Sequence, residues 1–310
     1  MLDKSVTING INIYQEYGVL LLTNSYNSLF SYPKMKSSFF ENDWHEISGS
    51  EIDFDTLFYA SKEISLNFYC KNFENYMNFL NYFTINNGTI LKIWNFGNIN
   101  YSLNLRFLNV INCTKMRDIY VFGIKFSQDN NFIPDNFNIS ALEATNTPEQ
   151  FEIDGYNIAL LNLKWLDKSI NNFLSIYDLK ENYNDNLNYN NGQVYKGNIL
   201  STKSKDVQIN LELKCINIDW FFLQYYNIFA VLMQKKEHIL SINELGQDFS
   251  FIYKSMNIKS ISFIHFIMIF ELTVQVIDGG LLTKSDNYIA LQDLSSFISM
   301  QNQTYIDNNL

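Results

Sequence analysis

The side chains best suited to chemistry are few and widely spaced in this sequence. The histidines are His45, His238 and His265, and none of them stands at a metal-ligand spacing such as HExxH or HxH. His45 lies in a polar segment and is expected to be solvated. His265 lies in an apolar run and is expected to be a hydrogen-bonded core residue. No GxSxG, P-loop or GxGxxG motif is present, so the histidines and glycines point to no known catalytic class.

Carboxylates gather in one segment near the N-terminus. Acid–base catalysis needs two carboxylates in a cleft with separated pKa values, and a calcium loop needs alternating acids around a glycine in a twelve-residue frame, which this segment does not fit. A solvated acidic loop is the favoured interpretation, with a hydrolase that uses Glu51 and Asp53 as a remote alternative. We therefore predict no enzyme activity, no metal and no cofactor. The acidic cluster comprises Glu41, Asp43, Glu46, Glu51, Asp53 and Asp55.

Composition narrows the class of protein further. The formal net charge is −10 and no basic tract occurs, which argues against stable binding of nucleic acid, because such binding neutralises phosphates with Lys and Arg. Hydrophobic residues make up 47% of the chain and aromatic residues 16%, enough for real cores and favourable for strands. The cysteines Cys70, Cys113 and Cys215 form no CxxC pair, which fits a reducing compartment.

The sequence pattern of the elements that position these residues occurs twice in the chain. Residues 61–68 read SKEISLNF and residues 204–211 read SKDVQINL, and INGINI at 8–13 is matched by IDGYNI at 153–158. Further matches follow in the same order, and their offset drifts only between 143 and 149, as loop insertions would produce. We read a tandem duplication, with one domain at 1–128, a linker at 129–150, a second domain at 151–278 and a C-terminal extension at 279–310.

Each copy is predicted to be mainly β with a minor α component. Apolar and polar residues alternate in the repeated strands, which is typical of a sheet with one buried face. Apolar residues at helical spacing predict helices over 73–83 and 218–234, the second with Asp219 as its N-cap. The apolar run 261–277 contains Glu271 and is short for a membrane helix, so we expect a buried strand or strand pair. The predicted fold is two tandem β-sandwiches or half-open barrels, each with one flanking helix.

A long polar and aromatic insertion interrupts the first copy between residues 24 and 59. Long loops in compact domains are usually functional or disordered, and exposed aromatic side chains are costly in water. We expect an arm that reaches a neighbouring subunit, with a mobile surface loop as the alternative. The candidate inter-subunit contacts are Phe39, Phe40, Trp44, Glu46, Glu51, Asp53 and Tyr59.

The first copy contains a W-x-E-x-S-G-x-E-x-D stretch from Trp44 to Asp53, then an SK-E strand from Ser61, then an aromatic helix. In this succession it resembles the distal tail and tail-tube-like proteins of long-tailed bacteriophages. The second copy lacks the Trp and the acids and shares the pattern only through the duplication. The residues that carry it are Trp44, Glu46, Ser48, Gly49, Glu51 and Asp53, followed by Ser61, Lys62, Glu63, Ile64 and Leu66.

The resemblance implies an assembly role in the virion tail. Tail-tube-like domains close into rings of six around a DNA channel, so two domains per chain imply a homotrimer with one ring or a homohexamer with two stacked rings. DNA would pass through an acidic lumen without specific binding. Partners would be the tail tube and hub or tip proteins, with assembly in the host bacterial cytoplasm and no membrane insertion. The alternative function is a tandem β-sandwich that binds glycans on the host surface through exposed aromatic residues.

Overall fold

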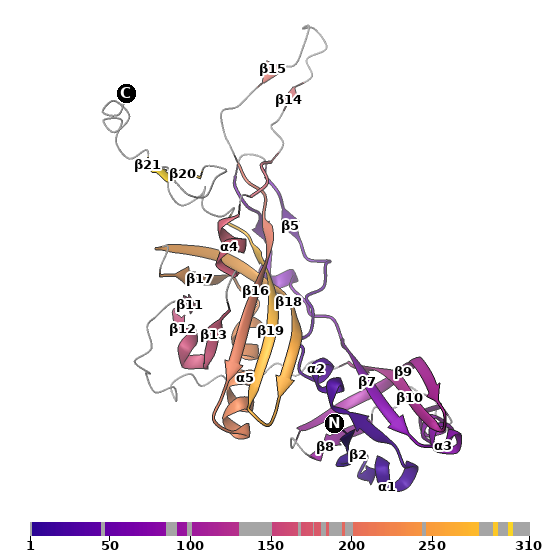
Figure 1. Cartoon of the computed structure of the whole chain (residues 1–310). Coiled ribbons are helices and arrows are strands. Elements are labelled where there is room, and N and C mark those ends of the chain that lie inside the picture. The colour runs from indigo at the N-terminus through magenta and orange to yellow at the C-terminus, as the bar shows by residue number, and fades with distance from the viewer. Residues whose placement is uncertain are drawn as a thin grey trace.

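The chain is mainly β, with antiparallel sheets joined by a few helices (Figure 1). The computed structural model describes residues 2–44, 47–84, 92–97, 101–129, 151–166, 169–175, 177–180, 184–185, 194–195, 201–243, 246–278, 288–290 and 297–299. We call residues 1–128 the first half and residues 151–278 the second half. The mainly β prediction is confirmed.

The first half contains an eight-stranded sheet. Its long helix, α3, follows strand β7 as predicted. Two short helices that we did not predict, α1 and α2, precede β7. The elements are β1 (Leu2–Asp3), β2 (Val6–Ile8), β3 (Ile11–Asn12), α1 (Ile13–Tyr17), β4 (Leu20–Leu22), η1 (Thr23–Ser25), α2 (Tyr26–Leu29), β5 (Glu41–Asn42), β6 (Glu51–Ile52), η2 (Phe54–Thr56), β7 (Lys62–Cys70), α3 (Phe73–Thr84), β8 (Lys92–Phe96), β9 (Tyr101–Met116) and β10 (Ile119–Gln128).

The second half contains a seven-stranded sheet and repeats the same succession. The elements are β11 (Phe151–Ile153), β12 (Tyr156–Asn157), η5 (Ile158–Leu161), β13 (Leu163–Trp165), α4 (Ser169–Leu174), β14 (Asn184–Asp185), β15 (Val194–Tyr195), β16 (Lys205–Lys214), α5 (Ile218–Leu232), β17 (His238–Ile242), β18 (Gln247–Ser262) and β19 (Ile267–Val276).

The two sheets have the same strand order. The first sheet runs β1-β4-β7-β10-β9-β8-β2-β3, and the second, read from its far end, runs β13-β16-β19-β18-β17-β11-β12. After β1, each strand of the first sheet therefore has a counterpart at the same place in the second. Every neighbouring pair is antiparallel in both sheets.

One long strand bends each sheet. Strand β9 pairs with β8 through residues 101–105 and with β10 through residues 106–116. Strand β18 likewise pairs with β17 through 247–251 and with β19 through 251–262. Each long strand has two register shifts against its hairpin partner, and such bulges bend a strand and increase its twist. The bend lets one strand serve two parts of the sheet.

Some side-chain hydrogen bonds also occur at equivalent positions in the two halves. Asn9 and Asp154 both adopt positive φ ahead of a glycine, at 50° and 54°. The Asn9 side-chain oxygen accepts a hydrogen bond from Ile93 N at 2.8 Å, and Asp154 accepts one from Ile239 N at 2.9 Å. The Asn-Gly and Asp-Gly pairs, which favour tight hairpins, therefore also fasten β2 and β11 to their neighbouring strands.

A second repeated bond fixes the short helix ahead of the SK strand. Buried Ser25 and Ser169 accept hydrogen bonds from Asn67 N and Asn210 N, at 2.7 and 2.8 Å. The lysine of each SK pair, Lys62 or Lys205, then donates from its ammonium to a carbonyl near the end of that helix. The repeated octapeptide thus positions a helix as well as forming a strand.

The long helices pack aromatic faces on the sheets. Phe79 and Phe83 of α3 are buried, and Phe83 stacks on Trp94 at 6.1 Å between ring centroids. Helix α5 begins at Ile218, and its N-cap is Asn217, whose side chain accepts from Trp220 N at 2.8 Å. The predicted cap Asp219 was wrong, because it lies one residue inside the helix.

The apolar run 261–277 forms the turn and second strand of the β18–β19 hairpin, so the strand-pair prediction is confirmed. The prediction for His265 was wrong. His265 lies exposed in the four-residue turn, because the run is interrupted by a turn where we assumed continuous strand. Of the two histidines that the structure describes, the buried one is His238, on β17.

The two halves meet in an aromatic seam. Phe30, at the end of α2, lies between Tyr101 of its own sheet and Phe222, Tyr225 and Phe263 of the second half, at centroid distances of 4.8, 5.7, 5.5 and 5.5 Å. Phe30 is fully buried. The hydrophobic core is therefore continuous from one half to the other.

The proposed linker and the C-terminal extension lie largely outside the described residues. Asp129 is described and pairs with Arg106 at 2.6 Å. In the extension, β20 (Tyr288–Ala290) pairs with β21 (Phe297–Ser299).

Candidate functional site: the first arm and its docking face

The insertion of the first half lies against the second half of the same chain. We call residues 31–60 the first arm, and residues 175–203, which hold the corresponding place in the second half, the second arm. In Figure 1, strand β5 of the first arm lies beside the second-half strands, far from the first-half sheet. We take this contact between the first arm and the second half as the candidate functional site.

Two tyrosines anchor the root of the first arm. The hydroxyl of Tyr32 donates to Tyr225 O at 3.0 Å, and that of Tyr253 donates to Pro33 O at 2.9 Å. Burial raises the pKa of both phenols well above the usual value, so both stay protonated donors. Met35 N adds a backbone bond to Lys254 O at 2.8 Å, at a bulge of β18.

An apolar patch covers the middle of the arm. Ile52 and Leu57 of the arm are buried against Ile252 and Ile277 of the second half. This small core is separate from the main one. It stabilises the contact because burying apolar surface gains about 25 cal/mol of free energy per Å² removed from water. The half-buried side chains around the patch are Met35, Phe39 and Phe54.

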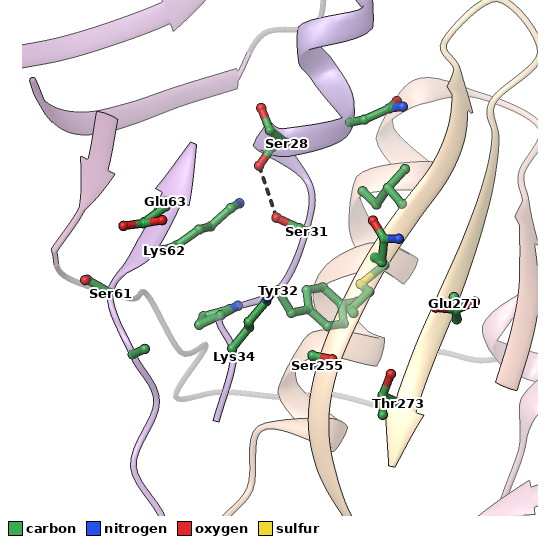
Figure 2. A pocket seen from close by; sticks show the side chains of 16 residues that line it. Ser28, Ser31, Tyr32, Lys34, Ser61, Lys62, Glu63, Ser255, Glu271 and Thr273 are labelled. Atoms are coloured by element: carbon green, nitrogen blue, oxygen red, sulfur yellow. Dashed lines mark hydrogen bonds between the residues drawn. The ribbon is translucent and has the colours of Figure 1, made fainter. Parts of the chain in front are cut away.

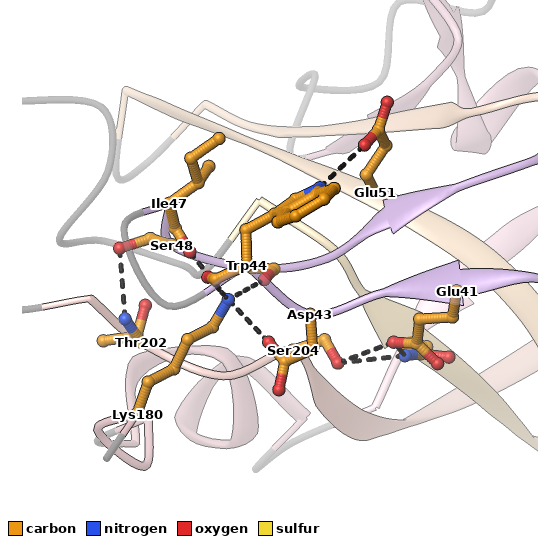
Figure 3. Close-up of polar contacts among 11 residues, drawn as sticks. Glu41, Asp43, Trp44, Ile47, Ser48, Glu51, Lys180, Thr202 and Ser204 are labelled. Carbon is orange, nitrogen blue, oxygen red and sulfur yellow. Dashed lines mark hydrogen bonds and ion pairs between the residues drawn. The ribbon is translucent and has the colours of Figure 1, made fainter. Parts of the chain in front are cut away.

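The tip of the arm encloses one ammonium group (Figure 3). Lys180 of the second arm donates to the carbonyl oxygens of Trp44, Ile47 and Gly49 at 2.7, 2.7 and 2.5 Å. Its Nζ also lies 2.6 Å from the Asp43 carboxylate, and the Lys180 side chain is only 1% exposed. Buried charges are tolerated when paired and hydrogen-bonded, and this lysine meets both conditions.

Polar bonds extend the contact on both sides of Lys180. Gly49 N donates to Thr202 O at 2.7 Å, and Thr202 N donates to the Ser48 hydroxyl at 3.1 Å. Glu41 accepts from the amide of Gln275 at 2.8 Å. The described part of the arm is thus held by backbone, side-chain and ionic contacts at its root, its middle and its tip.

The sequence-predicted contact residues fall into three groups. Phe39 joins the apolar patch, and Tyr59 packs near Tyr253, where burial raises the pKa of Tyr59 to about 12. Phe40 and Trp44 stay 59% and 50% exposed. Three acids remain: Glu51 accepts from Trp44 Nε1 at 2.9 Å, Asp53 caps the η2 turn, and Glu46 lies outside the described residues.

The residues that carry the contact were missed by the sequence analysis. Tyr32, Tyr253 and Lys180 stand in unremarkable sequence surroundings. One signal was available for Lys180: an offset of 144 aligns it with Lys36 of the first arm.

A cleft of about 840 Å³ with polar and apolar walls lies between the root of the first arm and the second sheet (Figure 2). Serines, Asn257, Glu271 and Thr273 line it, together with buried Lys62. Burial lowers the pKa of the Lys62 ammonium to about 7. Because Lys205 caps a helix end in the same manner, the position of Lys62 is explained by structure without a ligand.

A buried acid–histidine pair lies at the far end of the second sheet. His238 Nδ1 is 2.8 Å from Asp154 Oδ2, and Lys236 Nζ is 3.0 Å from the same oxygen. Burial by itself would raise the pKa of Asp154, but hydrogen bonds from His238, from Ile239 N and from Lys236 lower it to about 2. The pair holds the β11–β12 turn against β17, and no nucleophile is paired with it in the described residues.

The described part of the chain holds no group of three or more His, Cys, Asp or Glu residues placed to bind a metal ion. None of its helices is long and apolar enough to span a membrane. Neither protein-family models nor curated proteins give a match to this sequence.

Proposed function

We propose that this chain is a structural, ring-forming protein of a long-tailed bacteriophage, of the distal-tail or tube-to-baseplate adaptor type. The resemblance of the first half to that family motivates the phage assignment. The docked first arm is the observation that carries the assembly role, because it joins two units with the same strand order by unlike surfaces.

A contact between two unlike surfaces leaves each unit with one free surface, so the same contact can be repeated with the next unit. In a two-fold contact, each unit uses the same patch, so the contact closes after two units. Here the first half contributes its arm and the second half contributes the β18 face and Lys180. Heterologous contacts of this kind close into rings when the rotation permits. Two units per chain give one ring from three chains, or two stacked rings from six.

The charge supports a channel that does not hold DNA. The net charge of −10 repels phosphates, so DNA passing through an acidic lumen would slide and not bind. In this proposal, residues 1–128 and 151–278 are tail-tube-like domains that act as a rigid adaptor with no catalytic centre.

Glycan binding is less favoured by the geometry. Sugar stacking needs exposed aromatic rings on one sheet face. The large exposed aromatic side chains of the described residues lie instead on helices α1 and α3, the first arm and an edge strand: Tyr14, Phe40, Trp44, Phe58, Phe73 and Tyr156.

Two measurements test the assembly role. Light scattering of the purified chain at micromolar concentration should give three or six times the 36.4 kDa chain mass, and negative-stain images should show rings. A monomer in both measurements would overturn the proposal.

A further inference from the structure

We propose that the first half of one chain packs on helix α4 of a second copy, through helix α3 and the turn of the β9–β10 hairpin. This contact would repeat between chains the packing that joins the two halves within one chain. The inference rests on the proposed ring and names the two surfaces that would close it.

Within the chain, two elements of the second half cover helix α2 of the first half. The turn between β18 and β19 contributes Phe263, whose ring centroid lies 5.4 Å from that of Tyr26 and 5.5 Å from that of Phe30. Helix α5 contributes Phe222, at 5.7 Å from Phe30. A hairpin turn and a long helix of one half thus bury a short helix of the other, and Tyr26 and Phe30 are buried.

The first half has its own long helix in the corresponding place. The N-terminal caps of α3 and α5 are equivalent, because the side chains of Asn72 and Asn217 each accept a hydrogen bond from the backbone N–H three residues on, both at 2.8 Å. These caps lie 145 positions apart, and the same offset places Met77 of α3 where Phe222 stands in α5.

The long helix contacts the hairpin in both halves. In the second half, Phe221 of α5 lies 5.7 Å from Phe263 of the turn, between ring centroids. In the first half, Tyr76, the counterpart of Phe221, stacks on Tyr120 of β10 at 5.9 Å. Helix and hairpin therefore form one continuous surface in each half.

This surface is covered in the second half and open in the first. Phe73 and Met77 of α3 are 56% and 36% exposed, and the Phe73 ring lies 5.8 Å from that of Tyr120. Met116 and Ile119 pair at the end of the hairpin and are 65% and 36% exposed. Exposed apolar side chains that gather in one place mark an interaction site. We call Phe73, Met77, Met116 and Ile119 the α3–hairpin surface.

Helix α4 is the counterpart of the helix that is covered within the chain. The repeated serine bond fixes the offset between α2 and α4 at 144. Ile170 therefore stands where Tyr26 stands in α2, and Leu174 where Phe30 stands. Tyr26 and Phe30 are buried by the other half, whereas Ile170 and Leu174 remain only half-buried.

The two surfaces lie too far apart to meet within one chain. In Figure 1, α3 lies at the end of the first half that points away from the second half, and α4 lies on the second half, far from the first-half sheet. A second copy of the chain carries the counterpart that each surface has in the contact between the halves, so we name it as the occupant. The contact joins unlike surfaces and can therefore repeat until a ring closes.

The first test uses variants that damage opposite sides of the contact. The double variant Met77→Glu, Met116→Glu places two carboxylates on the α3–hairpin surface. Leu174→Glu places one on α4. Ile216→Glu makes the same change at a residue that is 84% exposed and outside both surfaces, and it serves as the control. Thermal unfolding of each variant checks that the fold is retained.

Light scattering at micromolar concentration should show rings for the wild type and for Ile216→Glu, and monomers for each contact variant alone. An equimolar mixture of the two contact variants should give a one-to-one dimer, because it retains one intact surface of each kind. Rings from either contact variant would overturn this inference and leave the ring itself standing, as would a mixture that stays monomeric. A monomeric wild type would overturn both.

A cross-linking experiment tests the same contact without a new charge. Met77→Cys and Leu174→Cys are made in separate chains that also carry Cys113→Ser, which removes the exposed native thiol. Since Met77 and Leu174 are the counterparts of Phe222 and Phe30, a short bismaleimide should join the two variants into a covalent dimer. Each variant alone should stay a single chain after the same treatment. A mixture that gives no covalent dimer, while the wild type forms rings, would overturn the inference.

Discussion

Lys62 and Lys205 lie 143 positions apart and hold the same structural place. The ammonium of Lys62 donates to Leu29 O, the last residue of α2, and that of Lys205 donates to Asn172 O within α4. Each lysine follows a serine and opens the strand that pairs with the central hairpin of its half. A cation at a helix C-terminus also interacts favourably with the partial negative charge of the helix dipole there.

The buried position of Lys62 predicts a pH-dependent stability. Its pKa is lowered to about 7, so between pH 7 and 10 the unfolded chain holds a proton at this lysine that the folded chain has released. Stability contributed by Lys62 therefore rises with pH from 7, by about 1 kcal/mol per pH unit. The difference in unfolding free energy between wild type and Lys62→Met should follow this slope between pH 7 and 9. A difference independent of pH would contradict it. Lys205→Met, at a more exposed site, should show a smaller slope.

The repeated serines predict matched losses of stability. Ser25→Ala and Ser169→Ala each leave a strand N–H without its acceptor, at Asn67 and Asn210. These N–H groups are partly buried, where loss of a hydrogen bond costs about 1 kcal/mol, so we expect each variant to lose about that much free energy of unfolding in urea. Ser102→Ala, on an exposed strand position, should stay within about 0.5 kcal/mol of wild type. Loss at only one of the two serines would show that the halves do not use this bond equally.

Asp154 predicts a loss of stability in acid. The pKa of this carboxyl is lowered to about 2, below its unfolded value near 4. Its contribution is therefore complete above about pH 4 and is lost as the pH falls from 4 to 2. Allowing for solvent screening, we expect about 1 kcal/mol. Asp154→Asn introduces the residue type that Asn9 supplies in the first half, so the turn is retained.

The unfolding free energies of wild type and Asp154→Asn should differ at pH 6 and converge at pH 2. A constant difference over that range would rule out the ionised carboxylate as its source. Asp219→Asn, at an exposed acid, should show no such convergence.

We expect loss of the Lys180 ammonium to weaken the contact between the first arm and the second half. Lys180→Met leaves the Asp43 carboxylate and three carbonyl groups without the ammonium that joins them. Removal of one member of such a set costs about 3 kcal/mol. Limited proteolysis should then cut within residues 43–49 faster than in wild type. The exposed neighbour variant Lys203→Met should be cut at the wild-type rate. Equal protection of all three proteins would contradict the role of Lys180.

The sequence predicted those features that are local and periodic. Alternation located β7 and β16, and apolar spacing located α3 and α5, because both signals are set by backbone geometry. The apolar run at 261–277 was correctly expected to hold a strand pair. His265 was misplaced because Phe263 and Ile264 continue the apolar pattern through the turn.

The contact between the first arm and the second half could not be predicted from local sequence patterns. Tyr32, Tyr253 and Lys180 act through partners 131 to 220 positions away, and nothing near them in sequence identifies those partners. The acceptors of Lys180 are backbone carbonyls, whose position no side-chain pattern reports. The one sequence signal for this site is the alignment of Lys36 with Lys180. That signal becomes informative only once the structure shows that Lys180 is buried.

Electron cryomicroscopy of the purified chain can show whether the proposed head-to-tail assembly forms. We expect a closed ring in which the contact between chains superimposes on the contact between the first and second halves. A ring with a different contact between chains, or particles that contain a single chain, would contradict the proposal.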